Sequence, residues 1–262
     1  MTKNIQWFDA HAHIQLPQFD TDRAEVLARM QENQTDAIVV GTDFETSKTA
    51  VELAQQYDFL WASVGLHPNH TPEEKFDETM FTKLATHPRV VAIGECGLDY
   101  YRNEPSEATK KAQHERFKKH IGLALSCNKP LIVHCRPTAG TQNAHEEMFK
   151  LLAMHSDARS VMHFFTSTKE IAEKYLELGC YLSFSGPITF TDMYDEAIRA
   201  TPLDRMLSET DSPFAAPAPH RGRRSEPVYV EEVVKKIATV KNLSVEEVTV
   251  CILDNAKTVF GI

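Results

Sequence analysis

The sequence predicts a single-domain α/β protein with the (β/α)8 TIM-barrel fold, and two features of the 262-residue chain lead to this prediction. Eight short apolar segments, rich in Val, Ile and Leu, alternate with amphipathic helical segments. Near-continuous apolar strands are typical of parallel sheets that are buried on both faces. A strand–helix alternation repeated about eight times is the pattern of a (β/α)8 barrel, and no linker or repeat divides the chain. We therefore expect residues 1–262 to form one barrel.

The expected strands are short and bounded by residues that favour turns. Most begin or end beside Gly, Pro, Asp or Asn, which commonly interrupt strands. In chain order they are residues 5–11, 37–42, 60–68, 90–99, 131–135, 160–165, 181–186 and 206–213.

Most segments between the strands place apolar residues at i, i+3, i+4 and i+7, which produces one apolar helix face. These patterns cover residues 22–33, 45–57, 113–127, 145–155, 168–179 and 229–241. Gly179 is the last residue of one of them, as expected for a helix end. A closing helix is predicted from Ser244 to Phe260, because Ser244 and Glu247 have the spacing of a capping box.

The composition indicates a full hydrophobic core and an acidic surface. Hydrophobic residues make up 42% of the chain and the formal net charge is −9, which argues against a general nucleic-acid-binding surface but permits a locally basic cleft. No apolar run approaches the roughly 18 residues of a membrane span, and no apolar signal segment is visible. Five cysteines without a CxxC pair favour a reducing compartment, so we expect a cytoplasmic protein with no membrane contact.

Five of the expected strands end in histidine or acidic residues. The active site of a (β/α)8 barrel lies at the C-terminal ends of its strands, so these side chains should converge. His11 and His13 are two residues apart and point the same way from a strand. A buried carboxylate without a partner is costly, which favours a cation beside the acids. The six candidate ligands are His11, His13, Glu95, His134, His163 and Asp211.

This ligand set suits two divalent metal ions. Four histidines and two carboxylates exceed the needs of one tetrahedral ion, whereas two ions can share a bridging carboxylate. Zn, Mg, Mn, Fe or Ni would accept such ligands, so the metal stays open. We predict hydrolysis by a metal-bound hydroxide, with Asp211 as the proton acceptor.

The remaining histidines and two cysteines are interpreted as structural. Cys96 and Cys135 should face away from the barrel lumen by strand alternation. The other histidines lie in helical or loop patterns and are expected at the surface; they are His70, His87, His114, His120, His145 and His155.

Several segments, taken in order, resemble the TatD family of metal-dependent deoxyribonucleases, which belongs to the amidohydrolase-like barrels. The resemblance is carried by FDAHAH, SVGLHP, AIGECGLDYY, KPLIVHCR, MHFFTS, YLSFSG and LSETDSP followed by PHRGRRSEP. It runs from about Phe8 to the closing Asn255–Phe260 element, so it covers nearly the whole chain. The segments GECGLDYY and ETDSP are specific, whereas His-x-His alone is weak.

The resemblance implies a two-metal site with Glu95 as the bridging ligand. It also implies that Asp211 orients or deprotonates the attacking water. One ion would be held by His11, His13, Glu95 and Asp211, and the other by Glu95, His134 and His163.

The chain departs from the family pattern at two places. Phe164 stands where the family usually has Cys after the histidine, and we expect it to face outward as a packing change. In the segment Arg136-Pro137-Thr138, Pro and Thr stand where the family commonly has an acidic residue and Ala after the arginine. This loop should lie over the rim, so its change concerns the substrate and not the metals.

The expected substrate contacts are basic or aromatic residues close to the ligands. Arg221, Arg223 and Arg224 follow Asp211 in an acidic chain and indicate an anion-binding loop, although a solvated basic turn is the alternative. Arg136 is a second candidate. His67 would contact substrate or shape the rim. Tyr100, Tyr101 and Arg102 follow Glu95 in the same loop region, where an aromatic would stack a base or simply pack.

These features predict a two-metal hydrolase, foremost a phosphodiesterase that digests DNA from an exposed 3′ end. One alternative is hydrolysis of an amide or ester bond, such as an aminoacyl linkage, on the same metals. Another is a metal-binding scaffold without turnover, which is disfavoured because every ligand and the proton acceptor are present. The preference for DNA or RNA and the oligomeric state stay open.

Overall fold

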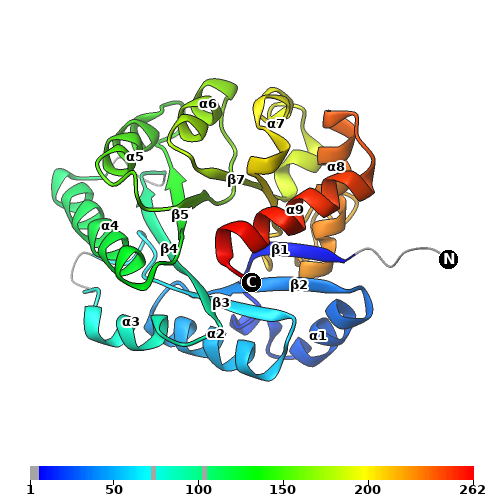
Figure 1. Ribbon diagram of the computed structural model, residues 1–262, viewed down its shortest axis with the longest axis horizontal. Helices are drawn as coiled ribbons and strands as arrows, with labels where there is room; N and C mark the ends of the chain where they lie inside the picture. The colour runs from blue at the N-terminus through cyan, green and yellow to red at the C-terminus, as the bar shows by residue number, and fades with distance from the viewer. Residues whose placement is uncertain (1–5, 72–74, 102–104) are drawn as a thin grey trace.

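The computed structural model describes residues 6–71, 75–101 and 105–262, which form a barrel of eight parallel strands surrounded by helices (Figure 1). The strands pair in chain order from β1 to β8, and each pair is parallel. The segment that follows β8 joins the end of β1 through backbone hydrogen bonds from Asp211 to His11 and from His13 to Ser212, so the barrel is nearly closed. The predicted (β/α)8 fold is confirmed.

Most of the strands end earlier than the sequence predicted. The third stops at Val64, and the chain beyond it bonds to a neighbouring loop, since the His67 N–H donates to Thr42 O. The eighth stops at Ser208, although the Glu209 and Asp211 N–H groups beyond it still donate to Phe184 O and His11 O. Ile5, the predicted start of the first strand, lies outside the described residues. The strands are β1 Trp7–Ala12, β2 Thr35–Val40, β3 Leu60–Val64, β4 Val90–Asp99, β5 Leu131–Arg136, β6 Ser160–Met162, β7 Tyr181–Phe184 and β8 Met206–Ser208.

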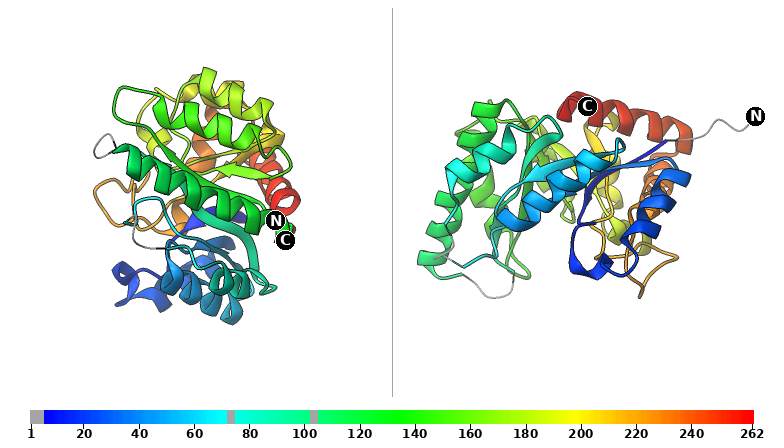
Figure 2. Two further views of the ribbon diagram at one scale, coloured as in Figure 1. Left: turned by 90° about the vertical axis from the view of Figure 1, so that its left-hand side faces the viewer. Right: turned by 90° about the horizontal axis from the view of Figure 1, so that it is seen from below.

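Helices form the outer layer of the barrel (Figure 2). The predicted capping box of the last helix is confirmed, since Ser244 and Glu247 bond reciprocally to each other's backbone N–H. α3 and α7 are short and were not predicted. The α-helices are α1 Arg23–Glu32, α2 Phe44–Gln56, α3 Glu78–Ala85, α4 Glu107–Cys127, α5 Asn143–Ala153, α6 Lys169–Glu177, α7 Asp195–Ala200, α8 Val230–Lys241 and α9 Val245–Phe260, and the 3-10 helices are η1 Pro17–Phe19, η2 Gly186–Phe190, η3 Leu203–Arg205 and η4 Pro227–Tyr229.

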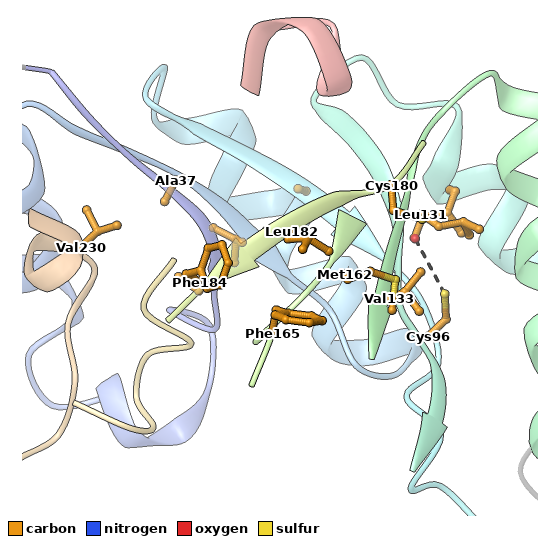
Figure 3. Packing of buried hydrophobic residues seen from close by; sticks show 14 of the residues in the cluster. Ala37, Cys96, Leu131, Val133, Met162, Phe165, Cys180, Leu182, Phe184 and Val230 are labelled. Atoms are coloured by element: carbon orange, nitrogen blue, oxygen red, sulfur yellow. Dashed lines mark hydrogen bonds between the residues drawn. The ribbon is translucent and has the colours of Figure 1, made fainter. Parts of the chain in front are cut away.

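The hydrophobic core has two layers. The larger fills the space between strands and helices, where Cys96, Val133 and Leu182 pack (Figure 3), so Cys96 faces away from the lumen as predicted. The smaller fills the barrel interior and includes Phe8 of β1. Phe260 of α9 packs on Phe8 with ring centroids 6.3 Å apart, so α9 covers the end of the barrel where the strands begin. The opposite end is left for a site.

Two of the histidines expected at the surface are buried, so that interpretation was wrong for them. His120 on α4 accepts a hydrogen bond from the Leu66 N–H at 2.9 Å, and burial lowers its pKa to about 4. His145 on α5 lies 2.9 Å from the Tyr175 hydroxyl. A helical pattern assigns polar residues to solvent, but each of these rings has a buried partner.

Within the described ranges, no helix has the length and apolar character needed to cross a membrane. A cytoplasmic location stays a prediction.

Candidate metal centre

The six predicted ligands converge at the C-terminal ends of the strands. His11 lies in β1, Glu95 in β4 and His134 in β5, while the other three follow their strands within three residues. Most of them line a cavity of about 680 Å³, and His11 lies fully buried behind it. This geometry agrees with the predicted convergence of the six side chains on one rim of the barrel.

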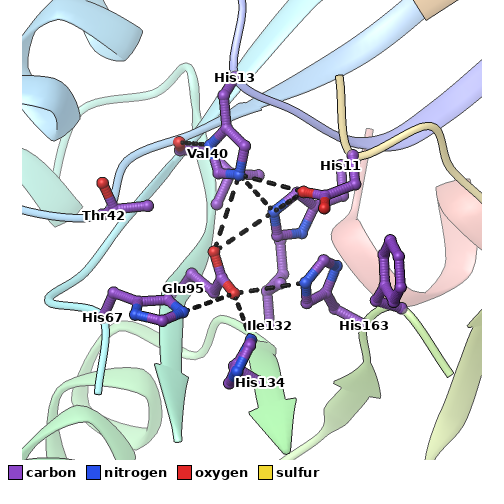
Figure 4. A network of polar contacts seen from close by, with 12 residues as sticks. His11, His13, Val40, Thr42, His67, Glu95, Ile132, His134 and His163 are labelled. Atoms are coloured by element: carbon purple, nitrogen blue, oxygen red, sulfur yellow. Dashed lines mark hydrogen bonds and ion pairs between the residues drawn. The ribbon is translucent and has the colours of Figure 1, made fainter. Parts of the chain in front are cut away.

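Glu95 lies at the centre of the group, and its two oxygens face different neighbours (Figure 4). Oε1 lies 2.8 Å from His134 Nδ1, 3.3 Å from His163 Nε2 and 3.2 Å from His67 Nε2. Oε2 lies 3.5 Å from His11 Nε2 and 3.8 Å from His13 Nε2. Glu95 therefore separates two sets of imidazoles, one on each oxygen.

Asp211 completes the set around His11 and His13. Its Oδ1 lies 3.3 Å from His13 Nε2 and 3.8 Å from His11 Nε2. Its backbone is left-handed, with φ of 56°, and its N–H donates to His11 O. This bond ties the segment after β8 to β1 and directs the carboxylate at the histidine pair.

A glycine in β4 allows the close approach of β4 and β5. Gly97 has φ of 137°, and a Cβ there would overlap the carbonyl oxygen of His134. The Gly-Glu-Cys-Gly segment thus brings Glu95 against His134.

The residues present fit divalent cations. His11 Nε2 and His13 Nε2 face each other at 3.1 Å, with carboxylate oxygens of Glu95 and Asp211 nearby. Two neutral imidazole lone pairs repel unless a proton or cation lies between them, and imidazole with carboxylate suits Zn, Mn and similar ions. Three groups could each hold an ion within the described residues; they are His11–His13–Asp211, His11–Glu95–His163 and His67–Glu95–His134.

Comparison with known proteins identifies the family. The sequence model described as TatD related DNase matches residues 8–261. The chain belongs to the TatD family. It is 38% identical to the metal-dependent hydrolase YabD of Bacillus subtilis, over 97% of this chain and 99% of that protein. It is 32% identical to the 3′-5′ ssDNA/RNA exonuclease TatD of Pantoea vagans, over 97% and 98%. This TatD-family protein is therefore a metal-dependent hydrolase.

The same architecture occurs in a solved structure. The crystal structure of the TatD homologue YjjV from Escherichia coli is 24% identical, covers 99% of both chains and superposes with a TM-score of 0.87. It supports the TatD barrel fold.

Two further carboxylates, here called the second layer, contact predicted ligands of this TatD-family chain, and sequence reasoning missed them. Asp99 Oδ2 lies 3.0 Å from His134 Nε2, and Glu209 Oε1 lies 2.8 Å from His163 Nδ1. Acidic partners of this kind orient metal-binding histidines and raise their basicity. Each lies in a segment that also carries a predicted ligand: Asp99 in GECGLD with Glu95, and Glu209 in ETD with Asp211. This closeness in sequence was the signal that could have identified them.

The electrostatics keep Glu95 ionised despite burial. Burial raises the pKa of Glu95, but His67, His163, His11 and His134 outweigh it and hold this pKa well below its usual range. Burial lowers the pKa of His134, yet the hydrogen bonds and charges of Asp99 and Glu95 raise it to about 9. The surrounding imidazoles therefore keep Glu95 as a carboxylate, although burial lowers the pKa of His11 and of His67 themselves.

His67 and Cys135 lie close to the ligands. His67, expected to contact substrate or shape the rim, lies beside Glu95 in one of the groups that could hold an ion. Cys135 Sγ lies 3.3 Å from His145 Nδ1 on α5, consistent with its predicted outward direction, although the residue also borders the cavity.

Phe164 was expected to face outward, and this was wrong. It borders the cavity, and its ring centroid lies 5.7 Å from that of His163. A left-handed backbone, with φ of 49°, redirects the chain after β6, so strand alternation no longer applies.

The predicted basic contacts lie in two places. Arg136 borders the cavity, with its guanidinium 3.6 Å from the Tyr101 ring centroid. Arg221, Arg223 and Arg224 are absent from the described residues that border it. Arg224 is paired with Asp22 and Glu226, Arg221 stacks over Phe190 at 3.8 Å, and Arg223 is exposed. Arg102 lies outside the described residues.

Proposed function

We propose that this TatD-family hydrolase is a two-metal phosphodiesterase that digests DNA from the 3′ end. The observation that carries the proposal is Glu95, whose two oxygens face two separate sets of ligands. One carboxylate between two such sets is the arrangement that two ions share. His11, His13 and Asp211 would hold one ion, and His134 and His163 the other.

The protein supplies positioning and a proton acceptor. When bound, the ions would make water more acidic and neutralise charge on the phosphoryl group. Asp211 borders the cavity while its Oδ1 lies 3.3 Å from His13, so its carboxylate faces both the ligands and the substrate space. A carboxylate in that position can take the proton of the attacking water.

The choice of a phosphodiester rests on the relatives and on charge. Two relatives, from Pantoea vagans and Shigella flexneri, are named 3′-5′ ssDNA/RNA exonucleases. Arg136 places a cation on the cavity border of an otherwise acidic chain. A guanidinium there suits a phosphate better than a neutral amide.

The test is cleavage of 5′-labelled single-stranded DNA by protein loaded with Zn, Mn or Mg. We expect a ladder that shortens from the 3′ end and stops when a chelator is added. A matched sample of Asp211→Asn should leave the DNA intact. Cleavage of an aminoacyl ester, without cleavage of DNA under any metal, would favour the alternative hydrolase and overturn this proposal.

A further inference from the structure

The cavity has two chemically different walls. The C-terminal ends of β2, β3, β4 and β5 and the loops that follow them contribute mainly polar residues, here called the polar wall: Thr42, His67, Asn69, His70, Asp99 and Arg136. The loops that follow β6, β7, β8 and β1 contribute mainly apolar residues, here called the apolar wall: Leu16, Phe164, Pro187, Tyr194, Phe214 and Ala215. The strands follow one another around the barrel in chain order, so each wall is a continuous half of the rim.

Two phenylalanines of the apolar wall lie beside the metal-ligand histidines. The Phe214 ring centroid lies 6.1 Å from that of His13, and the Phe164 centroid lies 5.7 Å from that of His163. His11 stacks on His163 at 3.7 Å and meets His13 edge-on at 4.8 Å. A run of ring contacts therefore leads from Phe214 through the histidines to Phe164.

Neither phenylalanine is placed as a core residue. Phe214 is 46% exposed, although both core layers bury comparable rings almost completely. Phe164 is half-buried and adopts a left-handed backbone, which is unfavourable for a bulky side chain. Its N–H donates to Glu209 Oε1 at 2.8 Å, and this bond holds the strained residue in place. Strain of this kind clusters at ligand-binding sites.

We propose that Phe164 and Phe214 bind the base of the terminal nucleotide by stacking. This inference rests on the proposed nuclease function. When a phosphodiester is bound at the candidate ligands, the base of the adjoining nucleotide lies close to the same rim. A base presents an apolar face on which an aromatic ring can stack. The polar wall, with Arg136, then faces the sugar-phosphate chain. Stacking tolerates all bases, so little base preference is expected.

Binding of metal-loaded protein to short single-stranded DNA tests the proposal, with a phosphorothioate in the 3′-terminal linkage to slow cleavage. One DNA carries an intact 3′-terminal nucleotide and the other an abasic one. We expect the parent to bind the intact DNA about tenfold tighter, within the range for stacking one base. Phe164→Ala and Phe214→Ala should bring this ratio close to one, and Phe214→Trp should restore it.

Two further measurements separate stacking from a structural role. With ordinary DNA, Phe214→Ala should raise KM about tenfold and change kcat less than about twofold, because stacking is present in ground state and transition state alike. Metal content should not change. Met154→Ala, at a 65% exposed position after α5, is the matched control and should keep the parent ratio.

The outcomes are distinguishable. A parent that binds both DNAs equally, or Phe214→Ala with the parent ratio, overturns the stacking proposal even if DNA is digested. A parent that cleaves no phosphodiester overturns the nuclease proposal, while the binding ratio still decides whether the phenylalanines receive a base.

Discussion

At the scale of single residues, the position of Glu95 between two ligand sets has a direct consequence for metal content. Glu95→Ala should reduce the occupancy of both ions, because each loses a carboxylate oxygen. His163→Ala should weaken one ion more than the other, since its Nε2 lies 3.3 Å from Glu95 Oε1, the oxygen that also contacts His134. Metal analysis of the purified variants measures both effects. Full occupancy in Glu95→Ala would show that Glu95 is not a bridge.

Asp211 is expected to matter for the rate more than for metal retention. Asp211→Asn keeps one oxygen near His13 but cannot accept a proton, so turnover should fall at least about 10²-fold, the lower range for general-base catalysis. The measurement is kcat at matched metal content. A near-parent rate with intact metal would assign the proton to another acceptor.

The second layer allows a prediction that needs no substrate. Glu209→Gln removes the charge beside His163 Nδ1 but keeps a polar oxygen there. Loss of such a partner typically lowers metal affinity about 10- to 100-fold. Competition with a metal chelator would measure this, with Glu146→Gln on the helix α5 as a surface control. Unchanged affinity would mean that Glu209 serves the loop backbone alone.

At the scale of elements, the sequence predicted the alternation but not the ends. Buried strands and amphipathic helices have distinct periodicities, so the barrel and the convergence of the six candidate ligands could be predicted. The direction of side chains beyond a strand end depends on the backbone there, and Phe164 and Asp211 both have positive φ. Alternation fails at such residues, which is why Phe164 was misplaced. Asp99 and Glu209 were missed because their histidine partners, His134 and His163, lie far away in the sequence and approach them only in the folded barrel.

The closing helix offers a stability test of a feature that the sequence did predict. Ser244 accepts from the Glu247 N–H, and Glu247 accepts from Ser244. Ser244→Ala removes this cap and should cost about 1 kcal/mol of unfolding free energy. For a chain of this size the midpoint of thermal unfolding should fall by roughly 2–4 °C. Ser244→Asp, which keeps a capping oxygen, should stay near the parent, and equal melting of all three would contradict the cap.

At the scale of the whole molecule, the arginines predicted to bind phosphate lie in two places relative to the candidate ligands. Arg136 borders the cavity, whereas Arg221 and Arg223 belong to the loop after β8 and do not border it. Arg224 is committed to Asp22 and Glu226, so its loss would mix stability with binding. Arg221 and Arg223 are therefore the residues of this loop that test contact with DNA.

Substrate length should separate the two groups of arginines. Arg136→Ala should lower kcat/KM about tenfold or more for a dinucleotide and for a long strand alike, because a charge-assisted phosphate contact contributes roughly 1.5–3 kcal/mol. The Arg221→Ala, Arg223→Ala double variant should impair long strands and reduce their salt dependence. It should spare the dinucleotide, since neither arginine borders the cavity. Rates at several salt concentrations measure both effects, with metal content held equal. If the double variant digests long strands at the parent rate and salt slope, the loop is a solvated basic turn and Arg136 alone carries the phosphate proposal.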